Sequence, residues 1–397
     1  MYKLDELIQE LCPNGVEYKK IKDIYLRLRG TPITAGKMNE IKSPDGEIKI
    51  FAGGKTIINA HEKDIPNANI IRVPAVLIQS RGIIDVIFYD KPFTFKNEMW
   101  AYSSDDIVSV KFLYYVLKSN VQQFRDSASC MGSLPQISLP VTEEFKIPAP
   151  PLPVQREIVR ILDTFTELTA ELTAELTARK KQYDYYLEKL LTFNKEEIQW
   201  LKLKEIATCM YRGYGITKDS ITATGTPCVR YGEIYTKYGI WFDNCLSNTQ
   251  ESQITNPKYF EHGDILFTLT GESIDDIAKS CAYMGNERCL AGGDIAVMKH
   301  NQNPKYLSYA LATLSAKKQK GKGKVKSKVV HSSIPSISEI IIPVPPLEEQ
   351  ERIVSILDRF DTICNDLTSG LPAEIEARRK QYEYYRDKLL TFKEKKA

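Results

Sequence analysis

The chain has 397 residues, 43% of them hydrophobic, which is enough for two or three domains with their own apolar cores. Its net charge of +3 is too small to identify a partner, and no apolar run approaches a membrane span. We find no signal peptide, and therefore expect a cytoplasmic protein. The eight cysteines include no C-x-x-C pair and there are only four histidines, which argues against a zinc site and favours reduced thiols.

The first block, residues 16–146, has the pattern of a mixed α/β domain. Its apolar run at 74–89 is broken by a Gly turn, as in two strands, and residues 111–117 have the spacing of a short amphipathic helix. Two Arg-Gly pairs lie in this block: Arg29 and Gly30 open the loop RGTPIT, and Arg81 precedes Gly82.

A segment at residues 147–193 returns at residues 342–392, where IPAPPLPVQREIVRILDTF…RKKQYDYYLEKLLTF becomes IPVPPLEEQERIVSILDRF…RRKQYEYYRDKLLTF. This duplication predicts a two-lobed molecule with near twofold internal symmetry. The prolines favour an extended approach and then permit a helix to begin. The apolar residues that recur in steps of three and four are Ile158, Ile161, Phe165, Leu168, Leu172 and Leu176, with Ile353, Ile356, Phe360, Ile363, Leu367 and Leu371 at the matching positions.

Each helix of about 40 residues would be roughly 60 Å long at ~1.5 Å per residue, so its apolar stripe needs a cover. We therefore expect the two copies to pack antiparallel along one another. Within the opening segment 1–15, YKLDELI (Tyr2–Ile8) resembles YLEKLL (Tyr186–Leu191) at the end of the first long helix, which predicts that the N-terminus lies beside the end of the C-terminal helix. The second copy is longer between Leu371 and Tyr382, next to Gly370 and Pro372, which predicts a break and imperfect symmetry.

Within the first long helix, Leu-Thr-Ala recurs in four-residue units at residues 168–179. Four residues do not match the 3.5-residue heptad spacing, so a plain helix gains little from this regularity. We expect this helix to act as a ruler between the two blocks, and an ordinary amphipathic helix is the alternative.

The second block, residues 198–341, is related to the first. IQWLKLKEI matches VEYKKIKDI, and RGYGIT, which begins at Arg212 and Gly213, matches RGTPIT. The run at 263–277 has the pattern of strands, and residues 305–311 that of a short helix. The predicted fold class is α+β, with two mixed α/β domains separated by two long antiparallel helices and internal pseudo-twofold symmetry. The predicted segments are 1–15, 16–146, 147–197, 198–341 and 342–397.

Charge is concentrated in one place, since residues 295–338 contain no Asp or Glu. We expect the Gly-punctuated lysine run there not to fold on itself and to lie along a phosphate backbone, with a solvated loop as the alternative. The paired Arg-Gly loops support nucleic-acid binding, because glycine lets the backbone approach a ligand closely. The lysines of the run are Lys317, Lys318, Lys320, Lys322, Lys324, Lys326 and Lys328.

Three motifs of catalysis are absent or incomplete. GGKT at residues 53–56 lacks the earlier glycine of a phosphate loop, where Lys49 stands. In PDGEIK, Asp45 and Glu47 are two residues apart in a turn, whereas metal-dependent nucleases draw their acids from successive strands. No G-x-G-rich cofactor loop is followed by an Asn/Asp-Pro-Pro-aromatic motif. We therefore predict no catalytic residue, no metal site and no bound cofactor in this chain.

The alternation of two blocks with P-x-P-P-L-x-x-Q-x-x-I-V-x-I-L-D-x-F and R-K-K-Q-Y-x-Y-Y resembles the specificity (S) subunit of Type I restriction-modification enzymes over essentially the whole chain. The resemblance implies two target recognition domains at a fixed separation, each reading one half of an asymmetric bipartite site in double-stranded DNA. It also implies two flanking methylation (M) subunits that carry S-adenosylmethionine, and restriction (R) subunits that complete a nuclease dependent on ATP and Mg²⁺.

The Arg/Lys/Tyr-rich helix ends look like docking surfaces for the methylation subunits, and packing between the two helices is the alternative for the tyrosines. These residues are Arg179, Lys180, Tyr183, Tyr186, Arg378, Arg379, Tyr382 and Tyr385. Two rival classes remain. A coiled-coil scaffold does not explain the Arg-Gly loop in each block, and a fused restriction-methylation enzyme would need the missing cofactor motifs.

Overall fold

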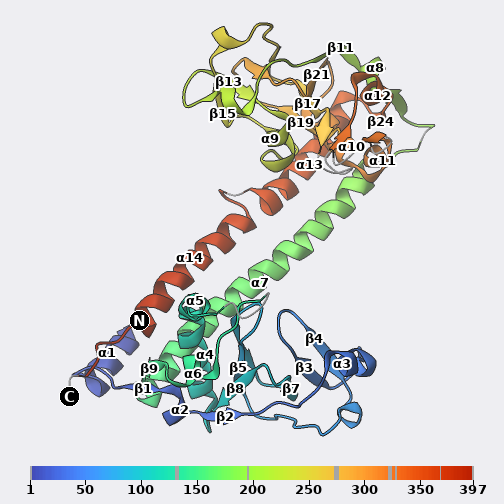
Figure 1. Cartoon of the computed structure of the whole chain (residues 1–397). Helices are drawn as coiled ribbons and strands as arrows, with labels where there is room; N and C mark the ends of the chain where they lie inside the picture. Colours follow the sequence, from blue (N-terminus) through green and yellow to red (C-terminus); the bar gives the residue numbers. More distant parts are fainter. Residues whose placement is uncertain are drawn as a thin grey trace. The chain divides into compact units, whose positions relative to one another are not determined.

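The structure, a computed structural model, describes residues 2–129, 134–194, 196–271, 277–320, 324–326, 329–366 and 368–395. The chain divides into two compact units. Unit 1 contains Met1–Glu171 and Glu376–Ala397, and unit 2 contains Leu172–Ile375. Each unit combines one α/β domain, called the first or the second domain below, with stretches of the helical repeats (Figure 1). Among the described helices, none is long and apolar enough to cross a lipid bilayer.

The first domain is built on a four-stranded sheet in the order β2-β8-β5-β6 and a three-stranded sheet in the order β4-β3-β7. The strands are β2 (Leu26–Leu28), β3 (Ile48–Phe51), β4 (Ile57–Ala60), β5 (Ala75–Gln79), β6 (Asp85–Tyr89), β7 (Phe93–Phe95) and β8 (Trp100–Ser103). The small helices are α2 (Ile21–Ile24), α3 (Ala35–Ile41), α5 (Val121–Asp126) and α6 (Leu139–Glu143). The strands predicted at 74–89 are confirmed as β5 and β6, with Gly82 between them at φ +78°.

The second domain has two five-stranded sheets, in the orders β11-β21-β17-β19-β14 and β12-β15-β13-β20-β16, and a three-stranded sheet, β18-β23-β22. The strands of the first sheet are β11 (Ala207–Arg212), β14 (Trp241–Phe242), β17 (Ile265–Thr268), β19 (Ser280–Tyr283) and β21 (Ile295–His300). Those of the second are β12 (Ile221–Thr222), β13 (Thr226–Val229), β15 (Ser247–Thr249), β16 (Tyr259–Phe260) and β20 (Cys289–Ala291). The remaining elements are α8 (Leu203–Ile206), α9 (Tyr231–Thr236), α11 (Leu314–Lys320), α12 (Ile334–Ser338), β18 (Thr270–Gly271), β22 (Lys324–Lys326) and β23 (Val329–His331).

In each unit an equivalent helix packs between the sheet of the domain and the helical repeat. In α4 (Ile107–Ser119) the Asp106 side chain caps the first turn by accepting from the Val108 N–H at 2.7 Å. In α10 (Pro304–Ala312) Asn303 does the same for the Tyr306 N–H at 3.1 Å. The helices predicted at 111–117 and 305–311 are thus confirmed.

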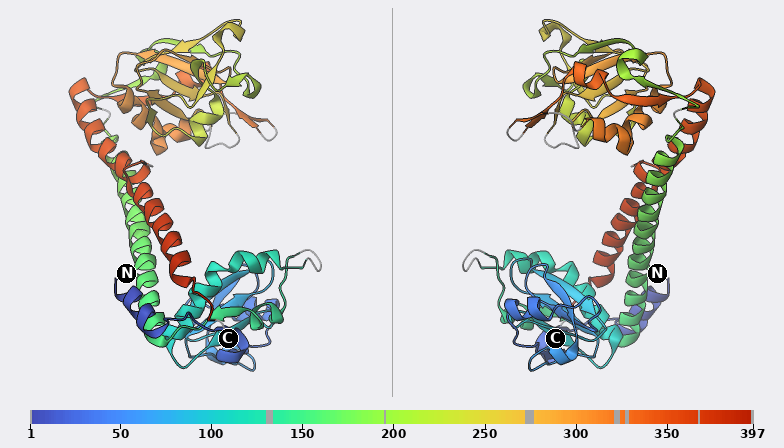
Figure 2. Two further views of the ribbon diagram at one scale, coloured as in Figure 1. Left: turned by 90° about the vertical axis from the view of Figure 1, so that its left-hand side faces the viewer. Right: turned by 90° about the vertical axis from the view of Figure 1, so that its right-hand side faces the viewer.

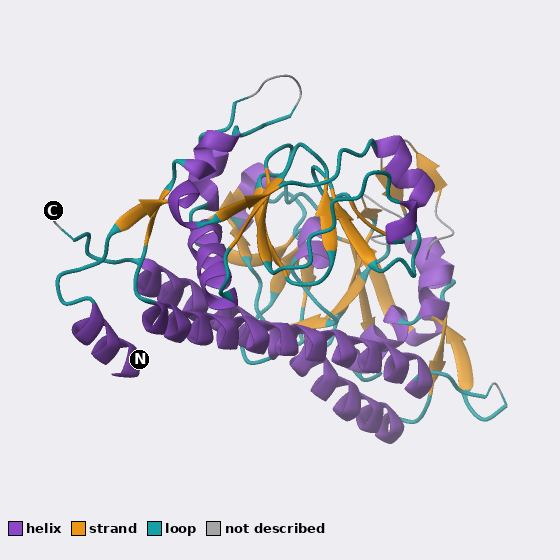
Figure 3. Cartoon of the chain, turned by 90° about the horizontal axis from the view of Figure 1, so that it is seen from below, coloured by secondary structure: helices purple, strands orange, loops and turns teal. Residues whose placement is uncertain are grey.

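The first helical repeat is one unbroken helix, α7 (Leu152–Leu190), whereas the second is interrupted between α13 (Leu347–Asn365) and α14 (Leu371–Leu390). At the break, Asp366 accepts from the Ser369 hydroxyl at 2.6 Å and from the backbone N–H of Thr368 at 2.7 Å. A Cβ on Gly370 would lie 2.4 Å from the Thr362 carbonyl oxygen, so this turn needs glycine. The predicted break is confirmed, and Figure 1 shows α13 and α14 as separate helices; Figure 3 distinguishes helices from loops by colour.

The two repeats hold their proline-rich linkers by the same contact. Gln155 donates from Nε2 to the Pro150 carbonyl at 2.8 Å, and Gln350 donates to the Pro345 carbonyl at 2.8 Å. Each linker also forms a short antiparallel pair with the segment that enters its domain: β1 (Tyr18–Lys20) with β9 (Lys146–Pro148), and β10 (Gln199–Lys202) with β24 (Ile341–Val344). Glutamine therefore stands in the repeated motif because its amide satisfies a linker carbonyl.

Each repeat also holds its domain through one aspartate. In unit 1, Asp163 accepts from Lys111 Nζ at 2.5 Å and from the Tyr115 hydroxyl at 2.6 Å. In unit 2, Asp358 accepts from Lys305 Nζ at 2.7 Å and from the Tyr309 hydroxyl at 2.7 Å. The internal symmetry read from the repeats thus extends to side-chain contacts, and the predicted class of two repeated mixed domains with long helices is confirmed.

Matched aromatic pairs link the two repeats inside each unit. Phe165 stacks on Tyr385 in unit 1 at 5.4 Å between ring centroids, and Tyr186 stacks on Phe360 in unit 2 at 5.3 Å. In both units an early residue of one repeat faces a late residue of the other, as an antiparallel pair requires.

The N-terminal helix α1 (Tyr2–Leu11), at the blue end of the chain in Figure 2, belongs to unit 1. Its Leu4 shares a core with Leu389 and Leu390. The Val16 N–H donates to the Lys393 carbonyl at 2.9 Å. The predicted pairing of the N-terminus with the end of the C-terminal helix is confirmed.

Candidate nucleic-acid interface

The two Arg-Gly loops occupy equivalent places in the two domains. The Thr31 N–H donates to the Phe95 carbonyl at 2.9 Å, and the Tyr214 N–H donates to the Ala291 carbonyl at 3.0 Å. A Cβ on Gly30 would lie 1.9 Å from the Phe95 oxygen, and one on Gly213 would lie 2.2 Å from the Gly292 oxygen. The close neighbour that we expected to be a ligand is therefore the chain's own backbone, which accounts for glycine at both positions. A DNA contact by these glycines stays a prediction.

The three predicted arginines differ in their partners. Arg212 donates from Nη2 to Asp294 at 2.6 Å and from Nε to the Gly293 carbonyl at 2.5 Å, so a neighbouring carboxylate offsets its charge. Arg29 and Arg81 are exposed, and no ion pair involves either guanidinium within the described ranges. These two are the freer cations for a phosphate or a base edge.

The expectation that the lysine run cannot fold on itself is wrong. Lys317, Lys318 and Lys320 lie in α11, which is anchored by the buried Ala316, while Lys324 and Lys326 belong to β22, paired with β23. β23 in turn pairs with β18. Backbone hydrogen bonds therefore hold this segment in a sheet although its sequence is rich in like charges.

The lysines of the run are also not equivalent. Lys317 and Lys318 are exposed, whereas Lys320 is partly buried and donates to the Ser280 hydroxyl at 3.2 Å. Burial, with Lys317 and Lys279 nearby, lowers the pKa of Lys320 to about 7. Lys320 is therefore a poor phosphate ligand. Lys322 and Lys328 lie outside the described residues.

A cavity of about 720 Å³ opens in the second domain next to the Arg212 loop, between loops that are far apart in the sequence. The charged or hydroxylated residues among its lining are Thr217, Lys218, Arg230, Tyr231, Glu233, Thr236, Lys237, Ser247 and Asp294. Asp294 is the residue that pairs with Arg212, so the predicted loop forms one lip of this cavity.

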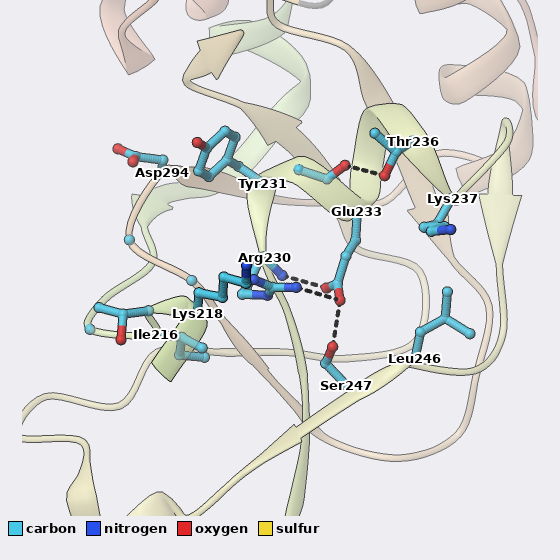
Figure 4. A pocket seen from close by; sticks show the side chains of 15 residues that line it. Ile216, Lys218, Arg230, Tyr231, Glu233, Thr236, Lys237, Leu246, Ser247 and Asp294 are labelled. Carbon is cyan, nitrogen blue, oxygen red and sulfur yellow. Dashed lines mark hydrogen bonds and ion pairs between the residues drawn. The ribbon is translucent and has the colours of Figure 1, made fainter. Parts of the chain in front are cut away.

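The wall of the cavity is organised by Glu233, which is only 7% exposed. Its carboxylate accepts from the Ser247 hydroxyl at 2.5 Å and from the backbone N–H of Arg230 at 2.8 Å (Figure 4). The Arg230 guanidinium lies 3.5 Å from the same carboxylate, and its Nε is buried without a hydrogen-bond partner in the described part of the chain. Glu233 thus contacts both the backbone and the guanidinium of Arg230, and the guanidinium keeps N–H donors without a partner among the described residues.

Sequence reasoning missed Arg230 because its neighbours come from the segments around residues 215–218, 246–247 and 292–294. The local signal was the acid at the third position of α9, where Glu233 accepts from the Arg230 N–H. That signal marks a helix start and predicts no cavity.

The first domain has different residues at the matching place. Its parallel pair β3 and β7 puts Phe51 opposite Phe95, as β13 and β20 put Val229 opposite Ala291. The next residue is Ala52, where the second domain has Arg230. Two residues further on, the Gly54 N–H donates to the Arg81 carbonyl at 3.3 Å. The loop after β5, which contains Arg81, therefore contacts this place in the first domain through its backbone.

The four predicted interface tyrosines pack inside their own units. Tyr183 is 9% exposed, and burial raises its pKa. Tyr186 and Tyr385 form the aromatic pairs described above, and Tyr382 packs partly buried against the core of unit 1. Packing between the repeats, the alternative for these tyrosines, is what the structure contains. The predicted cations Arg179, Lys180 and Arg379 are exposed, and Arg378 is partly buried.

Two other tyrosines are exposed at matching positions of the repeats. Tyr185 is 58% exposed and Tyr384 is 63% exposed. Each lies edge-on against the next tyrosine, with ring centroids 5.3 Å apart in both pairs. The motif Y-x-Y-Y contained this signal, since its middle tyrosine points away from the face that packs.

Asp45 and Glu47, weighed above as nuclease acids, serve the fold. Glu47 accepts from the Glu62 N–H at 2.9 Å and pairs with His61 Nδ1 at 2.8 Å, and these contacts lower its pKa to about 2. Across the described residues, no group of three or more His, Cys, Asp or Glu side chains could hold a metal ion.

Comparison with known proteins gives a consistent picture. The family model described as the Type I restriction modification DNA specificity domain matches residues 13–179 and again residues 195–377. The chain is 31% identical over 369 residues to the type I restriction enzyme EcoR124I/EcoR124II specificity subunit of Escherichia coli, covering 87% of each chain.

Two solved structures share the fold. The S subunit of a type-I restriction-modification system from M. genitalium has a TM-score of 0.63 at 17% identity, with 95% of this chain and 97% of that chain covered. A chain from a study of complex assembly and conformational transition of the type I R-M system has a TM-score of 0.55 at 15% identity, with coverages of 95% and 98%.

Proposed function

Because this chain belongs to the family of Type I restriction-modification specificity subunits, we propose that it reads an asymmetric bipartite site in double-stranded DNA. Each domain reads one half of the site, and the helical repeats hold the methylation and restriction subunits. The chain is the non-catalytic subunit of that complex and works in the cytoplasm.

The observation that supports this proposal is that the two domains share their anchoring contacts and a parallel strand pair but differ in the residue that follows the first strand of that pair. Asp163 and Asp358 hold the two domains by the same pair of contacts, yet Ala52 stands in one domain where Arg230 stands in the other. Two domains held alike with unlike surfaces suit a target with two different halves.

A repeated surface supports two copies of one partner. The first tyrosine patch consists of Asp184, Tyr185, Glu188, Lys189 and Thr192, which line a shallow concavity. The second consists of Glu383, Tyr384, Asp387, Lys388 and Thr391, the same chemistry at the matching positions. Tyrosines are enriched at the centre of protein interfaces and charged residues at their polar rim, so we assign one methylation subunit to each patch.

The docking is tested by replacing the tyrosines one at a time. Tyr185→Ala or Tyr384→Ala should leave one methylation subunit bound, and the double variant should leave none, by native mass spectrometry. Tyr214→Ala is the control, because this tyrosine is 45% exposed in the second domain and outside both patches. Two subunits retained by the double variant would place the docking surface elsewhere.

The chemistry is assigned to the partner chains. S-adenosylmethionine is expected on the methylation subunits, and ATP with Mg²⁺ on the restriction subunits. The purified chain alone should neither methylate nor cleave DNA nor hydrolyse ATP. Methyl transfer by the isolated chain would contradict this assignment.

The reading function is tested by exchanging one domain, residues 16–146 or 198–341, for that of a relative. Methylome sequencing should find one half of the site altered and the other intact. A coiled-coil scaffold is the rival function, and it predicts no salt-dependent binding of duplex DNA. A swap that changed both halves would refute independent reading.

A further inference from the structure

The cavity of the second domain has cations at its rim and one buried acid inside. Lys218 and Lys237 line it as exposed cations. Asp294 lies at the lip, paired with Arg212, and Glu233 contributes a buried carboxylate. A phosphate is favoured by the rim lysines but repelled by Glu233 further in. The interior therefore suits a neutral group that accepts hydrogen bonds.

Arg230 is the donor that faces such a group. A guanidinium has five N–H donors in a fixed plane, and here it has one long contact, 3.5 Å to Glu233, with a buried Nε that lacks a partner among the described residues. Glu233 cannot easily move, since Ser247 and the Arg230 N–H hold its two oxygens. The guanidinium is thus oriented before any ligand arrives, which limits the entropy lost on binding.

An apolar side chain completes the rim. Leu246 lines the cavity and is 62% exposed. An aliphatic side chain left in water beside a cavity gains when the face of a base covers it. The cavity therefore offers Arg230 to a base edge, Leu246 to a base face, and the rim lysines to a neighbouring phosphate.

We propose that this cavity contacts one nucleotide of the target DNA, with Arg230 donating to the O6 and N7 acceptors of a guanine. Lys218 and Lys237 contact the adjacent phosphates, and Glu233 positions the guanidinium. Arginine to guanine is the commonest specific pairing in the major groove, because the planar fork matches both acceptors. Arg230 then determines specificity at one base pair of the half-site read by the second domain. The proposal rests on the proposed DNA-reading function.

The position of Arg230 fits this role. The backbone around it has a counterpart in the first domain, where Ala52 replaces the arginine. A residue that contacts one base must be replaceable while the surrounding backbone stays the same, and this position meets that requirement.

The test uses the full chain in complex with its methylation subunits, on a duplex library that varies the half-site of the second domain. Arg230→Lys keeps the charge beside Glu233 but loses the planar fork, and Arg230→Gln loses the charge. Both should reduce the preference for guanine at one position by roughly 10- to 100-fold and leave the other half-site unchanged. The control Arg288→Lys changes an exposed arginine of the same domain that packs on Tyr259, and it should not alter the recognised sequence.

The alternatives give different results. If Arg230 contacts a phosphate, Arg230→Lys keeps the recognised sequence and Arg230→Gln weakens binding to all sequences alike, which overturns the proposal. An unchanged sequence and affinity in both variants also overturns it. Thermal unfolding of each variant complex identifies a folding defect, and Arg230→Lys, with its charge retained, stays the deciding variant. If the wild-type complex has no sequence preference, the DNA-reading function itself fails, which is a separate outcome.

Discussion

The aspartate that anchors each domain gives a quantitative prediction. Asp358 is 29% exposed and accepts from Lys305, which is 19% exposed, and from Tyr309, whose side chain is completely buried. Asp358→Ala removes both acceptors at once. The Tyr309 hydroxyl then loses its acceptor, and Lys305 keeps the Trp241 ring, 3.8 Å from its Nζ to the ring centroid, and a longer-range attraction to Asp361.

Removing one member of a buried ion pair costs about 3–5 kcal/mol. The partial exposure of Asp358 reduces this, so we expect unit 2 to lose about 2–4 kcal/mol of unfolding free energy. Asp358→Asn keeps one carbonyl acceptor and should cost roughly half as much.

Urea unfolding followed by tryptophan fluorescence measures the effect. In a Trp100→Phe background the remaining tryptophans, Trp200 and Trp241, both report on unit 2. Glu351→Ala is the control, because this exposed acid of α13 should contribute within about 0.5 kcal/mol. If Asp358→Ala unfolds with the free energy of the control, the contacts of Asp358 with Lys305 and Tyr309 do not stabilise unit 2. The matching contacts of Asp163 could then not be taken as stabilising unit 1.

Three further predictions concern pH, phosphate contacts and helix length. Burial lowers the pKa of His300 to about 4, so the unfolded chain binds its proton first, and unit 2 should lose up to about 3 kcal/mol as pH falls from about 6.5 to 4. His300→Asn should flatten urea-derived stability across that window, whereas the exposed His262 changed to Asn should not. Replacing Lys317 and Lys318 by Gln should weaken binding to all sequences and reduce the salt slope by about 0.9 per phosphate contact, and a changed methylation motif with an unchanged slope would make them base readers. Deleting or adding one Thr-Ala-Glu-Leu unit within 168–179 changes the helix by roughly 6 Å, and methylome sequencing should find both half-sites intact with their spacer shifted by one or two base pairs, unless the break in the second repeat absorbs the change.

Sequence periodicity predicted the long helices and the joint beside Gly370 because both depend on local chemistry. Steps of three and four give a helix one apolar face wherever the chain lies. A glycine followed by a proline interrupts a helix, and the close approach of Gly370 to the Thr362 carbonyl is consistent with that local rule. The duplication also predicted that each domain would be carried in the same way.

The same information could not assign the tyrosines of the helix ends. In a sequence, the four covered tyrosines are chemically equivalent to Tyr185 and Tyr384. Tertiary packing decides the difference: Phe360 and Phe165 stack on Tyr186 and Tyr385, and the cores of the two units cover Tyr183 and Tyr382. The lysine run was misjudged for a similar reason. Its charge argued for an extended segment, but pairing of β23 with β18 supplied backbone hydrogen bonds that no local pattern announces.

The sequence by itself determined the two-domain plan, the repeated helices and the family, because these follow from local periodicity and from a duplicated motif. Tertiary structure alone decided which cations are free and which are paired. Arg212 had the motif but faces Asp294, while Arg230 had none and lies in the cavity with unused donors. The physical reason is that an ion pair or a cavity wall is made by residues far apart in the chain, and their meeting depends on strand register and loop packing.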